Sequence, residues 1–364
     1  MEDNVGADQC VCPNKKEADQ CVCPNKKMIS RYSRQELLSM IGKEGQEKIS
    51  KGKVVIIGCG ALGTHIANGL ARAGIGNIRI IDRDFIELHN LQRQILFTEE
   101  DIKKELPKAQ AAKEHLDKIN SEINIEAIVK DVNFTNIEKF IKGFDVVVDG
   151  TDNFSTRYLI NEACDKLSIP WIYGGAISTY GMSLTIVPGK TPCLACNFPL
   201  IPSPDLALTC DTSGVLSSTV SIAASVQLSE TLKILTGSSD LNKTLFSFDV
   251  WSLRFHNFET KKNPECSICV KKEYKLLKGD KGLSISNLCG QDSIQLIDLK
   301  QDGIDLKLLE ERISKFSNVK ANKFLLKFSV DSKDVTVFKD GRTIIKGIID
   351  QVEAKTFYNK YLGG

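Results

Sequence analysis

A glycine-rich motif in the first third of the chain has the residue types and the spacing that bind a nucleotide phosphate. Gly58, Gly60 and Gly63 form the pattern Gly-x-Gly-x-x-Gly, directly after an apolar run and at the start of a helical pattern. The missing side chains let backbone N–H groups approach phosphate oxygens. Asp82 follows about 20 residues later, where a carboxylate meets a ribose hydroxyl in such folds. The motif predicts nucleotide binding, but alone it does not distinguish NAD from ATP.

Basic and amide side chains follow the second predicted strand and can contact the phosphates of that nucleotide. In the segment 90–94, Arg93 has a guanidinium that holds phosphate oxygens in a fork, and Asn90 can bond ribose or phosphate. Lys108 opens a helical pattern after a proline, so its ammonium can reach the same phosphates. Either basic residue taken alone is more typical of a solvated surface charge than of a phosphate ligand.

A carboxylate follows the apolar run Val146–Val148, in the segment Asp149-Gly150-Thr151-Asp152-Asn153. Ligands of open α/β sheets bind at the carboxyl ends of the strands. Hard cations bridge nucleotide phosphates through one or two carboxylates and water, so we expect Asp152 to bind Mg²⁺. The alternative interpretation is that Asp152 caps the helix predicted from Phe154 to Lys166.

Four cysteines form two Cys-x-x-Cys pairs that are far apart in the sequence: Cys193 with Cys196, and Cys266 with Cys269. This spacing predicts tetrahedral zinc held by four thiolates, and a site with four protein ligands is closed and therefore structural. The metal would connect distant segments of an existing fold. A redox pair or buried thiols is the alternative.

Cys210 is a candidate nucleophile. It follows a Pro- and Ser-rich loop and precedes Asp211-Thr212-Ser213-Gly214, ahead of a long helical pattern. A thiol in an exposed loop is accessible to substrates. A lone cysteine is also often a small buried hydrophobe, so its type alone leaves both interpretations open.

The elements that must position these residues alternate short β-rich runs with helical patterns. We expect strands at 53–58, 78–82, 123–129, 145–149 and 245–251, and helices through residue 70, at 108–119, at 154–166 and at 219–235. This βαβ alternation predicts an α/β fold with a Rossmann-like mixed, mostly parallel sheet and helices on both faces. The carboxyl ends of its parallel strands would gather the candidate residues at one edge.

The length of 364 residues predicts one large and one small domain. Residues 1–27 contain the decapeptide Ala-Asp-Gln-Cys-Val-Cys-Pro-Asn-Lys-Lys twice; we interpret them as a disordered tail, with a metal or redox arm as the alternative. Residues 28–278 hold the motifs described above. Residues 279–364 follow a Lys-rich stretch and predict a small α+β domain, with helices at 306–316 and up to Tyr361 and strands at 324–330, 335–338 and 343–346.

Composition excludes some classes of function. Charged residues are 26% of the chain, but the formal net charge is only +2, which argues against nucleic acid or an anionic membrane as a partner. The longest apolar runs have the length of strands, and no signal-peptide pattern precedes them. Twelve cysteines in this pattern fit a reducing compartment, so we expect a cytoplasmic protein.

The ordered set of motifs resembles the MoeB/ThiF/HesA family, the bacterial relatives of ubiquitin-activating enzymes. The likeness covers roughly residues 32–278. It begins at Arg31-Tyr32-Ser33-Arg34-Gln35 and continues through the glycine motif, Asp82, the segment 90–94, Lys108, the segment 151–153, both cysteine pairs and Cys210. A dehydrogenase does not need this series of motifs.

The resemblance implies ATP-dependent adenylylation of the Gly-Gly carboxylate of a ubiquitin-like sulfur-carrier protein of the ThiS or MoaD type, for thiamine, molybdopterin or related sulfur transfer. It implies that Arg34 reaches the nucleotide from the second subunit of a homodimer and that Cys210 is the family's catalytic cysteine. ATP, Mg²⁺ and zinc are the implied cofactors. The implied catalytic residues are Cys210, Arg34, Arg93, Lys108 and Asp152. The implied nucleotide-binding residues are Gly58, Gly60, Gly63, Asp82, Asn90, Arg93, Gln94, Lys108, Asp152 and Asn153.

Other interpretations remain open at this stage. One alternative is a function known from family relatives, the adenylylation of a carboxylate in tRNA modification. Two others are a non-catalytic nucleotide-binding scaffold and an NAD-linked oxidoreductase. The C-terminal unit has no cysteine after Cys289, so it is not a rhodanese domain, and a separate sulfur donor such as a cysteine desulfurase or a rhodanese would be needed. The Gly363-Gly364 terminus is either a frayed helix end or a substrate tail.

Overall fold

The structure is a computed structural model that describes residues 30–200, 213–279, 283–287, 292–299 and 303–362. Three expectations concern residues outside these ranges: the tail 1–27, the candidate nucleophile Cys210 and the Gly363-Gly364 terminus. None of the helices in the described ranges has the length and apolar character that crossing a membrane requires.

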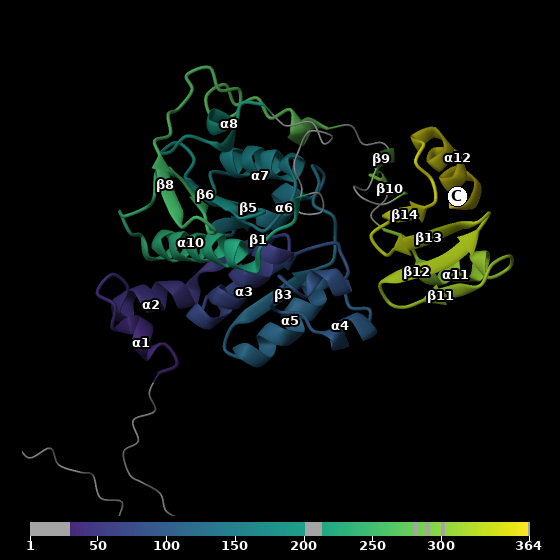
Figure 1. The fold of residues 1–364 in the computed structure, drawn as a ribbon, viewed down its shortest axis with the longest axis horizontal. Coiled ribbons are helices and arrows are strands. Elements are labelled where there is room, and N and C mark those ends of the chain that lie inside the picture. Colours follow the sequence, from purple (N-terminus) through teal and green to yellow (C-terminus); the bar gives the residue numbers. More distant parts are fainter. Residues whose placement is uncertain (1–29, 201–212, 280–282, 288–291, 300–302, 363–364) are drawn as a thin grey trace, which may run out of the picture.

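An eight-stranded mixed sheet forms the larger part of the molecule (Figure 1). Its first five strands, in sheet order, are mutually parallel, and the last three continue it in antiparallel pairing. This confirms the α/β fold class, because parallel neighbours require the βαβ crossovers that the sequence pattern indicates. The strands in sheet order are β3 (Asn124–Ile128), β2 (Asn77–Ile81), β1 (Lys53–Ile57), β4 (Val146–Asp149), β5 (Trp171–Ile177), β6 (Tyr180–Ile186), β7 (Leu245–Asp249) and β8 (Arg254–Phe258).

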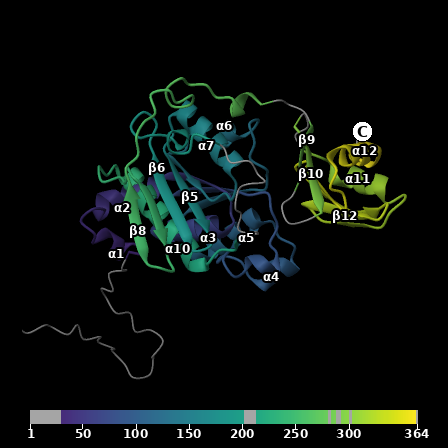
Figure 2. The ribbon, with the colours of Figure 1, turned by 45° about the horizontal axis from the view of Figure 1, so that its top comes forward.

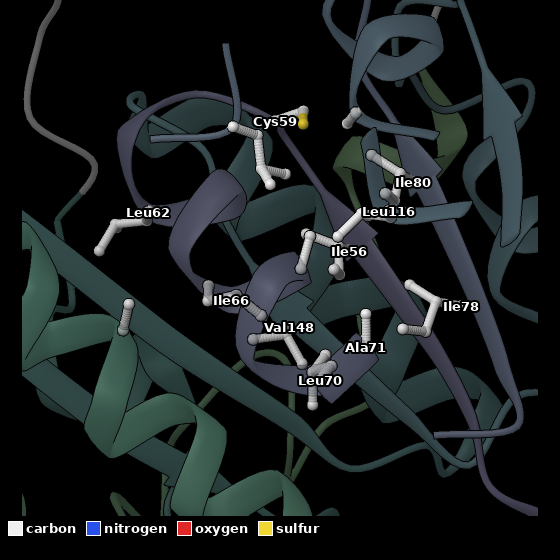
Figure 3. Close-up of a cluster of buried hydrophobic side chains, with 14 of the residues drawn as sticks. Ile56, Cys59, Leu62, Ile66, Leu70, Ala71, Ile78, Ile80, Leu116 and Val148 are labelled. Carbon is white, nitrogen blue, oxygen red and sulfur yellow. The ribbon is translucent and has the colours of Figure 1, made fainter. Parts of the chain in front are cut away.

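Helices cover both faces of this sheet, because successive residues of the central strands point to opposite sides. Ile56 of β1 packs into one buried cluster with side chains of α3 (Ala61–Ala73) and α5 (Lys108–Ile119), as Figure 3 shows. Val55 belongs to the cluster on the other face, beneath α7 (Phe154–Leu167). The remaining helices of this part are α1 (Ser33–Glu36), α2 (Gly42–Lys51), η2 (Leu88–Asn90), α4 (Glu99–Lys103), α6 (Ile137–Ile141), α8 (Leu194–Asn197), α10 (Ser217–Thr236) and η3 (Leu276–Lys278).

A separate antiparallel sheet of six strands forms the C-terminal part, which we define as residues 283–362 (Figures 1 and 2). It has its own buried cluster, in which Leu296, Val337 and Ile345 meet Ile313 and Phe357 of two helices. Its strands in sheet order are β11 (Val319–Ala321), β12 (Leu325–Val330), β13 (Lys333–Phe338), β14 (Thr343–Lys346), β10 (Ser293–Asp298) and β9 (Leu283–Asn287), and its helices are α11 (Leu306–Ile313) and α12 (Gln351–Tyr361).

The hairpin of β5 and β6, which adds the first antiparallel pair to the sheet, was not predicted from the sequence. Glycines in these strands obscure the pattern of strand residues. They are needed for packing: a Cβ on Gly174 would lie 2.4 Å from the Gln227 side chain, and one on Gly181 would lie 2.2 Å from the Phe248 ring. The cause is a tertiary contact with segments much later in the chain.

Candidate nucleotide and metal sites

The three glycines of the motif differ in why the structure needs a glycine at that position. Gly58 has a φ of +91°, and a Cβ there would lie 2.5 Å from the Gly150 carbonyl oxygen. A Cβ on Gly63 would lie 2.0 Å from the carbonyl oxygen of Gly58. Gly60 differs, because the nearest atom to its added Cβ is Gln94 Nε2, at 4.0 Å. Close packing requires Gly58 and Gly63, whereas the space beside Gly60 is open.

The Asp82 carboxylate fastens the glycine motif to the end of β2. Its Oδ2 accepts a hydrogen bond from the Cys59 backbone N at 2.5 Å, and its Oδ1 accepts one from the Asp84 backbone N at 2.6 Å. Burial raises the pKa of Asp82, and the positive charge of Lys108 opposes this shift. The carboxylate predicted to contact ribose therefore lies at the first turn of the glycine motif.

Lys108 begins α5 and its side chain is almost fully buried. Its Nζ lies 3.4 Å from Asp84 Oδ2. Burial acts to lower the pKa of Lys108, but the negative charges of Asp84, Asp82 and Asp152 outweigh it and raise the pKa. One buried cation thus interacts with three carboxylates that come from two strand ends, and it stays protonated.

The residues 90–94 place polar groups at the same edge of the sheet. Asn90 is buried, and its Oδ1 accepts from the Glu87 backbone N at 3.1 Å, so that this oxygen caps η2. Arg93 Nη1 donates to the His89 carbonyl at 3.0 Å. Gln94 is 3% exposed, and its Oε1 has no hydrogen-bond partner among the described residues. A buried acceptor without a partner beside the open space at Gly60 fits a site that a polar ligand completes.

Asp152 lies on the loop after β4, with its side chain exposed. The residue that caps α7 is Asn153, whose Oδ1 accepts from the Thr156 backbone N at 2.9 Å. The alternative interpretation of Asp152 as the helix cap is therefore wrong. Its Oδ1 accepts from the Asn153 side-chain amide at 3.2 Å, and its charge acts on Lys108. A carboxylate facing solvent beside a buried lysine is free to bind a hydrated cation.

A buried ion pair that the sequence analysis missed holds the loop that carries Asp152. Arg157 Nε donates to Asp149 Oδ2 at 3.0 Å, and its Nη2 donates to the carbonyls of Thr151 at 2.7 Å and Gly174 at 2.9 Å. Breaking such a pair by removing one partner costs about 3–5 kcal/mol, because a charge is left buried alone. The eight-residue separation of Asp149 and Arg157 across a helix start was the only sequence indication.

Arg34 lies near the end of α3 that is opposite to the glycine motif. The neighbouring Tyr32 ring packs on Gly74, where an added Cβ would be 2.4 Å from it. Gly74 caps the C-terminal end of α3, whereas the glycine motif leads into its N-terminal end. A helix of this length, 13 residues, spans about 20 Å. Arg34 is exposed, and two strongly exposed apolar side chains, Leu37 and Met40, follow it.

The two cysteine pairs come together in space. The sulfurs of all four lie within 4.8 Å of one another, with Sγ separations of 3.8 Å for Cys193–Cys196, 3.6 Å for Cys193–Cys266 and 3.5 Å for Cys196–Cys269. Tetrahedral zinc with its usual bond lengths would separate its sulfur ligands by about 3.8 Å. The donor set therefore fits a four-coordinate structural metal.

Hydrogen bonds to α7 orient both ends of this cysteine cluster. The Leu194 backbone N donates to Asn161 Oδ1 at 3.0 Å, which fixes the first pair. After the second pair, Lys272 Nζ donates to Asp165 Oδ2 at 2.8 Å and the Leu277 backbone N donates to Glu162 Oε2 at 3.0 Å. The chain segments on both sides of the cluster are thus attached to the same helix, α7.

Cys210, the candidate nucleophile, lies outside the described residues, so the structure does not place it relative to the other site residues. Among the described residues that follow it, the Gly214 carbonyl accepts from the Ser178 backbone N at 2.8 Å, and the Leu216 backbone N donates to the Ser178 carbonyl at 3.0 Å. Gly214 and Leu216 are thereby held against the turn between β5 and β6.

Residues 32–268 match the model of the ThiF family. The chain belongs to this family. It is 40% identical to the sulfur carrier protein ThiS adenylyltransferase of Bacillus subtilis, over 92% of this chain and 100% of that protein. It is 33% identical to the sulfur carrier protein adenylyltransferase of Thermus thermophilus, over 66% of this chain and 90% of that protein. The chain is therefore an adenylyltransferase of the ThiF family.

A solved structure of the same fold contains the nucleotide. Escherichia coli MccB in complex with ATP has a TM-score of 0.58 and 28% sequence identity, covering 68% of this chain and 76% of that chain. The ThiF fold of this chain thus corresponds to one that has been crystallised with ATP, which agrees with ATP, and not NAD, as the nucleotide.

Proposed function

We propose that this ThiF-family enzyme uses ATP to adenylylate the C-terminal Gly-Gly carboxylate of a ubiquitin-like sulfur-carrier protein. The observation that carries the proposal is the convergence of the glycine motif, Asp82, Lys108 and Asp152 at one edge of the sheet. Relatives named for this activity in Bacillus and Thermus support the carrier as the substrate.

The reaction follows from the charges at that edge. A carboxylate oxygen of the carrier attacks the α-phosphorus of ATP and forms an acyl-adenylate, while the bond from the α-phosphorus to the bridging oxygen breaks and releases pyrophosphate. A carboxylate nucleophile needs no general base. Lys108 and Arg93 stabilise negative charge on the phosphates, and the backbone around Gly60 binds them. Alignment of the two reacting groups supplies much of the remaining rate enhancement.

We assign Mg²⁺ to Asp152 and zinc to the four cysteines. An exposed carboxylate beside the phosphate-binding lysine is suited to a hydrated Mg²⁺, which would neutralise charge on the departing pyrophosphate. Four thiolates leave no open coordination position, so a zinc ion held by them would stabilise the fold and would take no part in catalysis. The use of ATP and of thiolate ligands is consistent with the cytosol as the location.

We further propose a homodimer in which Arg34 completes the site of the partner subunit. The distance of Arg34 from its own glycine motif and the exposed Leu37 and Met40 beside it support this arrangement.

The test of the dimer is complementation between two inactive variants. Co-expressed Arg34→Ala and Asp152→Asn chains should recover about a quarter of wild-type exchange, because half of the dimers are mixed and each mixed dimer has one intact site. Each variant alone should be inactive. No recovery in the mixture would place Arg34 in the site of its own chain, and full activity of Arg34→Ala alone would place it outside the mechanism.

The ThiS type is the carrier that we favour. The match to the Bacillus ThiS adenylyltransferase covers 92% of this chain and must therefore include most of the C-terminal part, whereas the Thermus match covers 66%. Sulfur would come from a separate donor protein, such as a cysteine desulfurase or a rhodanese.

The deciding experiment is ATP–pyrophosphate exchange by the purified protein with a ThiS-type carrier, with a MoaD-type carrier and with neither. We expect exchange that depends on the ThiS-type carrier and is lost when its terminal glycine is deleted. Exchange with the MoaD-type carrier alone would reassign the pathway. ATP binding without exchange under any condition would contradict the proposal and support a scaffold or a different carboxylate, such as one in tRNA modification.

A further inference from the structure

Arg342 of the C-terminal part is inserted into the edge of the larger part that carries the nucleotide site. Its side chain is 3% exposed. Its Nη2 donates to the backbone carbonyl of Arg83, and its Nη1 lies 3.5 Å from Asp84 Oδ1. Both partners directly follow Asp82 in the chain. A residue of the second sheet is thus buried against the segment that carries the candidate ribose ligand.

The tip of the hairpin between β13 and β14 holds Arg342 in this position. Gly341 turns the chain with a φ of +90°, and Asp340 Oδ1 accepts from the Arg342 backbone N at 3.1 Å. The centroid of the Phe338 ring lies 3.8 Å from Cζ of the guanidinium, and this ring is tilted against the Phe85 ring with centroids 5.5 Å apart. The guanidinium is therefore held by the hairpin below it, and Phe85 supports that hairpin through Phe338.

Asp84 joins Arg342 to the nucleotide site. Its Oδ2 lies 3.4 Å from Lys108 Nζ, and its backbone N donates to Asp82 Oδ1 at 2.6 Å. Burial raises the pKa of Asp84, but Lys108, Arg83 and Arg342 together lower it below its usual range, so the carboxylate is charged. One carboxylate is therefore shared between the candidate phosphate lysine and the arginine of the C-terminal part.

The environment of Arg342 is not fully complementary to its charge. Its Nε is buried without a hydrogen-bond partner among the described residues. Burial lowers the pKa of the guanidinium, with Asp84 acting against this shift. A contact that served only to join two parts of a protein would be served as well by apolar side chains of the same size. A reason for the buried cation is its interaction with Asp84, whose negative charge it stabilises.

We propose that the C-terminal part completes the ATP site through Arg342, which acts as a positioning residue by sharing the charge of Asp84 with Lys108. With Arg342 in place, Lys108 has ammonium protons available for phosphate, and the turn from Asp82 to Asp84 is fixed. Without it, Asp84 is left with Lys108 and with Arg83, whose Nε lies 3.6 Å from Asp84 Oδ1, so it holds Lys108 more strongly and competes with ATP. This inference rests on the proposed roles of Lys108 and Asp82 in ATP binding. It makes docking of the C-terminal part and ATP binding mutually dependent.

The test is the ATP dependence of carrier-stimulated exchange in the full-length protein. Arg342→Ala should raise the KM for ATP roughly tenfold, within the usual range of coupling between sites, and leave the KM for the carrier unchanged. Lys327→Ala is the matched control, because Lys327 also crosses to the larger part, 3.1 Å from Glu105, but is exposed and does not touch Asp84. It should behave as wild type.

A second variant separates charge sharing from simple loss of folding. Asp84→Asn combined with Arg342→Ala removes the carboxylate that would compete for Lys108, so the KM for ATP should return toward the wild-type value. Rescue would exclude a purely structural role for Arg342. An unchanged KM in Arg342→Ala, an equal increase in Lys327→Ala, or no rescue in the double variant would overturn the inference. Absence of exchange in the wild-type protein would instead refute the proposed function.

Discussion

Replacement of Asp152 by asparagine should reduce ATP–pyrophosphate exchange by roughly 10²–10³-fold without unfolding the protein. The loss follows from the role proposed for this carboxylate, since a metal ion that neutralises departing phosphate contributes several kcal/mol to transition-state stability, and each 1.4 kcal/mol is about tenfold in rate. Stability should change by only about 0.5 kcal/mol, because the side chain is exposed and the cap of α7 is supplied by Asn153.

The measurement is the exchange rate over a series of Mg²⁺ concentrations, with thermal unfolding monitored in parallel. Asp117→Asn is the control: Asp117 is an exposed acid whose one ion pair, with Lys113 at 2.9 Å, lies on the surface of α5. It should retain wild-type exchange. If Asp152→Asn keeps full activity at every Mg²⁺ concentration, Asp152 has no role in the mechanism.

Removal of one ligand of the cysteine cluster should produce the largest loss of stability among the changes considered. In Cys196→Ala the zinc content should fall to near zero. The free energy of unfolding should fall by about 4 kcal/mol, the size expected when a structural metal is lost. For a folded unit of this size, each kcal/mol corresponds to about 2–4 °C, so the melting temperature should fall by roughly 8–16 °C. The physical reason is that a metal held there would join the segment around Cys193 to that around Cys266, and the chain between these segments includes α10, β7 and β8.

Metal analysis and thermal unfolding of protein purified under reducing conditions check this prediction. Cys164→Ala is the control, because Cys164 is a buried, free cysteine of α7 that is not part of the cluster. It should keep its full zinc content and lose little stability. Wild-type protein without zinc, or a Cys196→Ala variant as stable as wild type, would refute the structural metal site.

Helices with a clear periodic pattern of apolar residues could be predicted from the sequence. The predicted helix at 108–119 is confirmed as α5, and the long helix predicted to end before Gly237 is confirmed as α10, with Gly237 in the left-handed conformation. These elements have strong amphipathic or apolar patterns and glycine or proline boundaries. The hairpin of β5 and β6 was not predicted, because packing against Gln227 and Phe248 requires its glycines, and glycines weaken the local strand pattern.

The residues of the candidate site that could be predicted are those in motifs whose spacing is typical of a binding function. The glycine motif, Asp82 and the two Cys-x-x-Cys pairs are local patterns with a known physical use, and the fold brings the cysteines within 4.8 Å of one another. Asp84 and Arg157 could not be selected in this way, because a single charged residue in a sequence does not indicate whether it will be buried. Their importance comes from the loss of solvent around them and from the partners that they meet there.

The family, the parallel α/β core, the motifs of the candidate nucleotide site and the two cysteine pairs could be predicted from the sequence, since each depends on residues at short, fixed spacings. The folded structure was needed to show which residue caps α7, how Arg157 holds the loop of Asp152, and that Arg342 reaches Asp84. Arg342 and Asp84 are separated by more than half of the chain and lie on loops in different parts of the molecule. Their interaction depends on how two parts with separate buried cores pack together, which no local pattern of residues encodes.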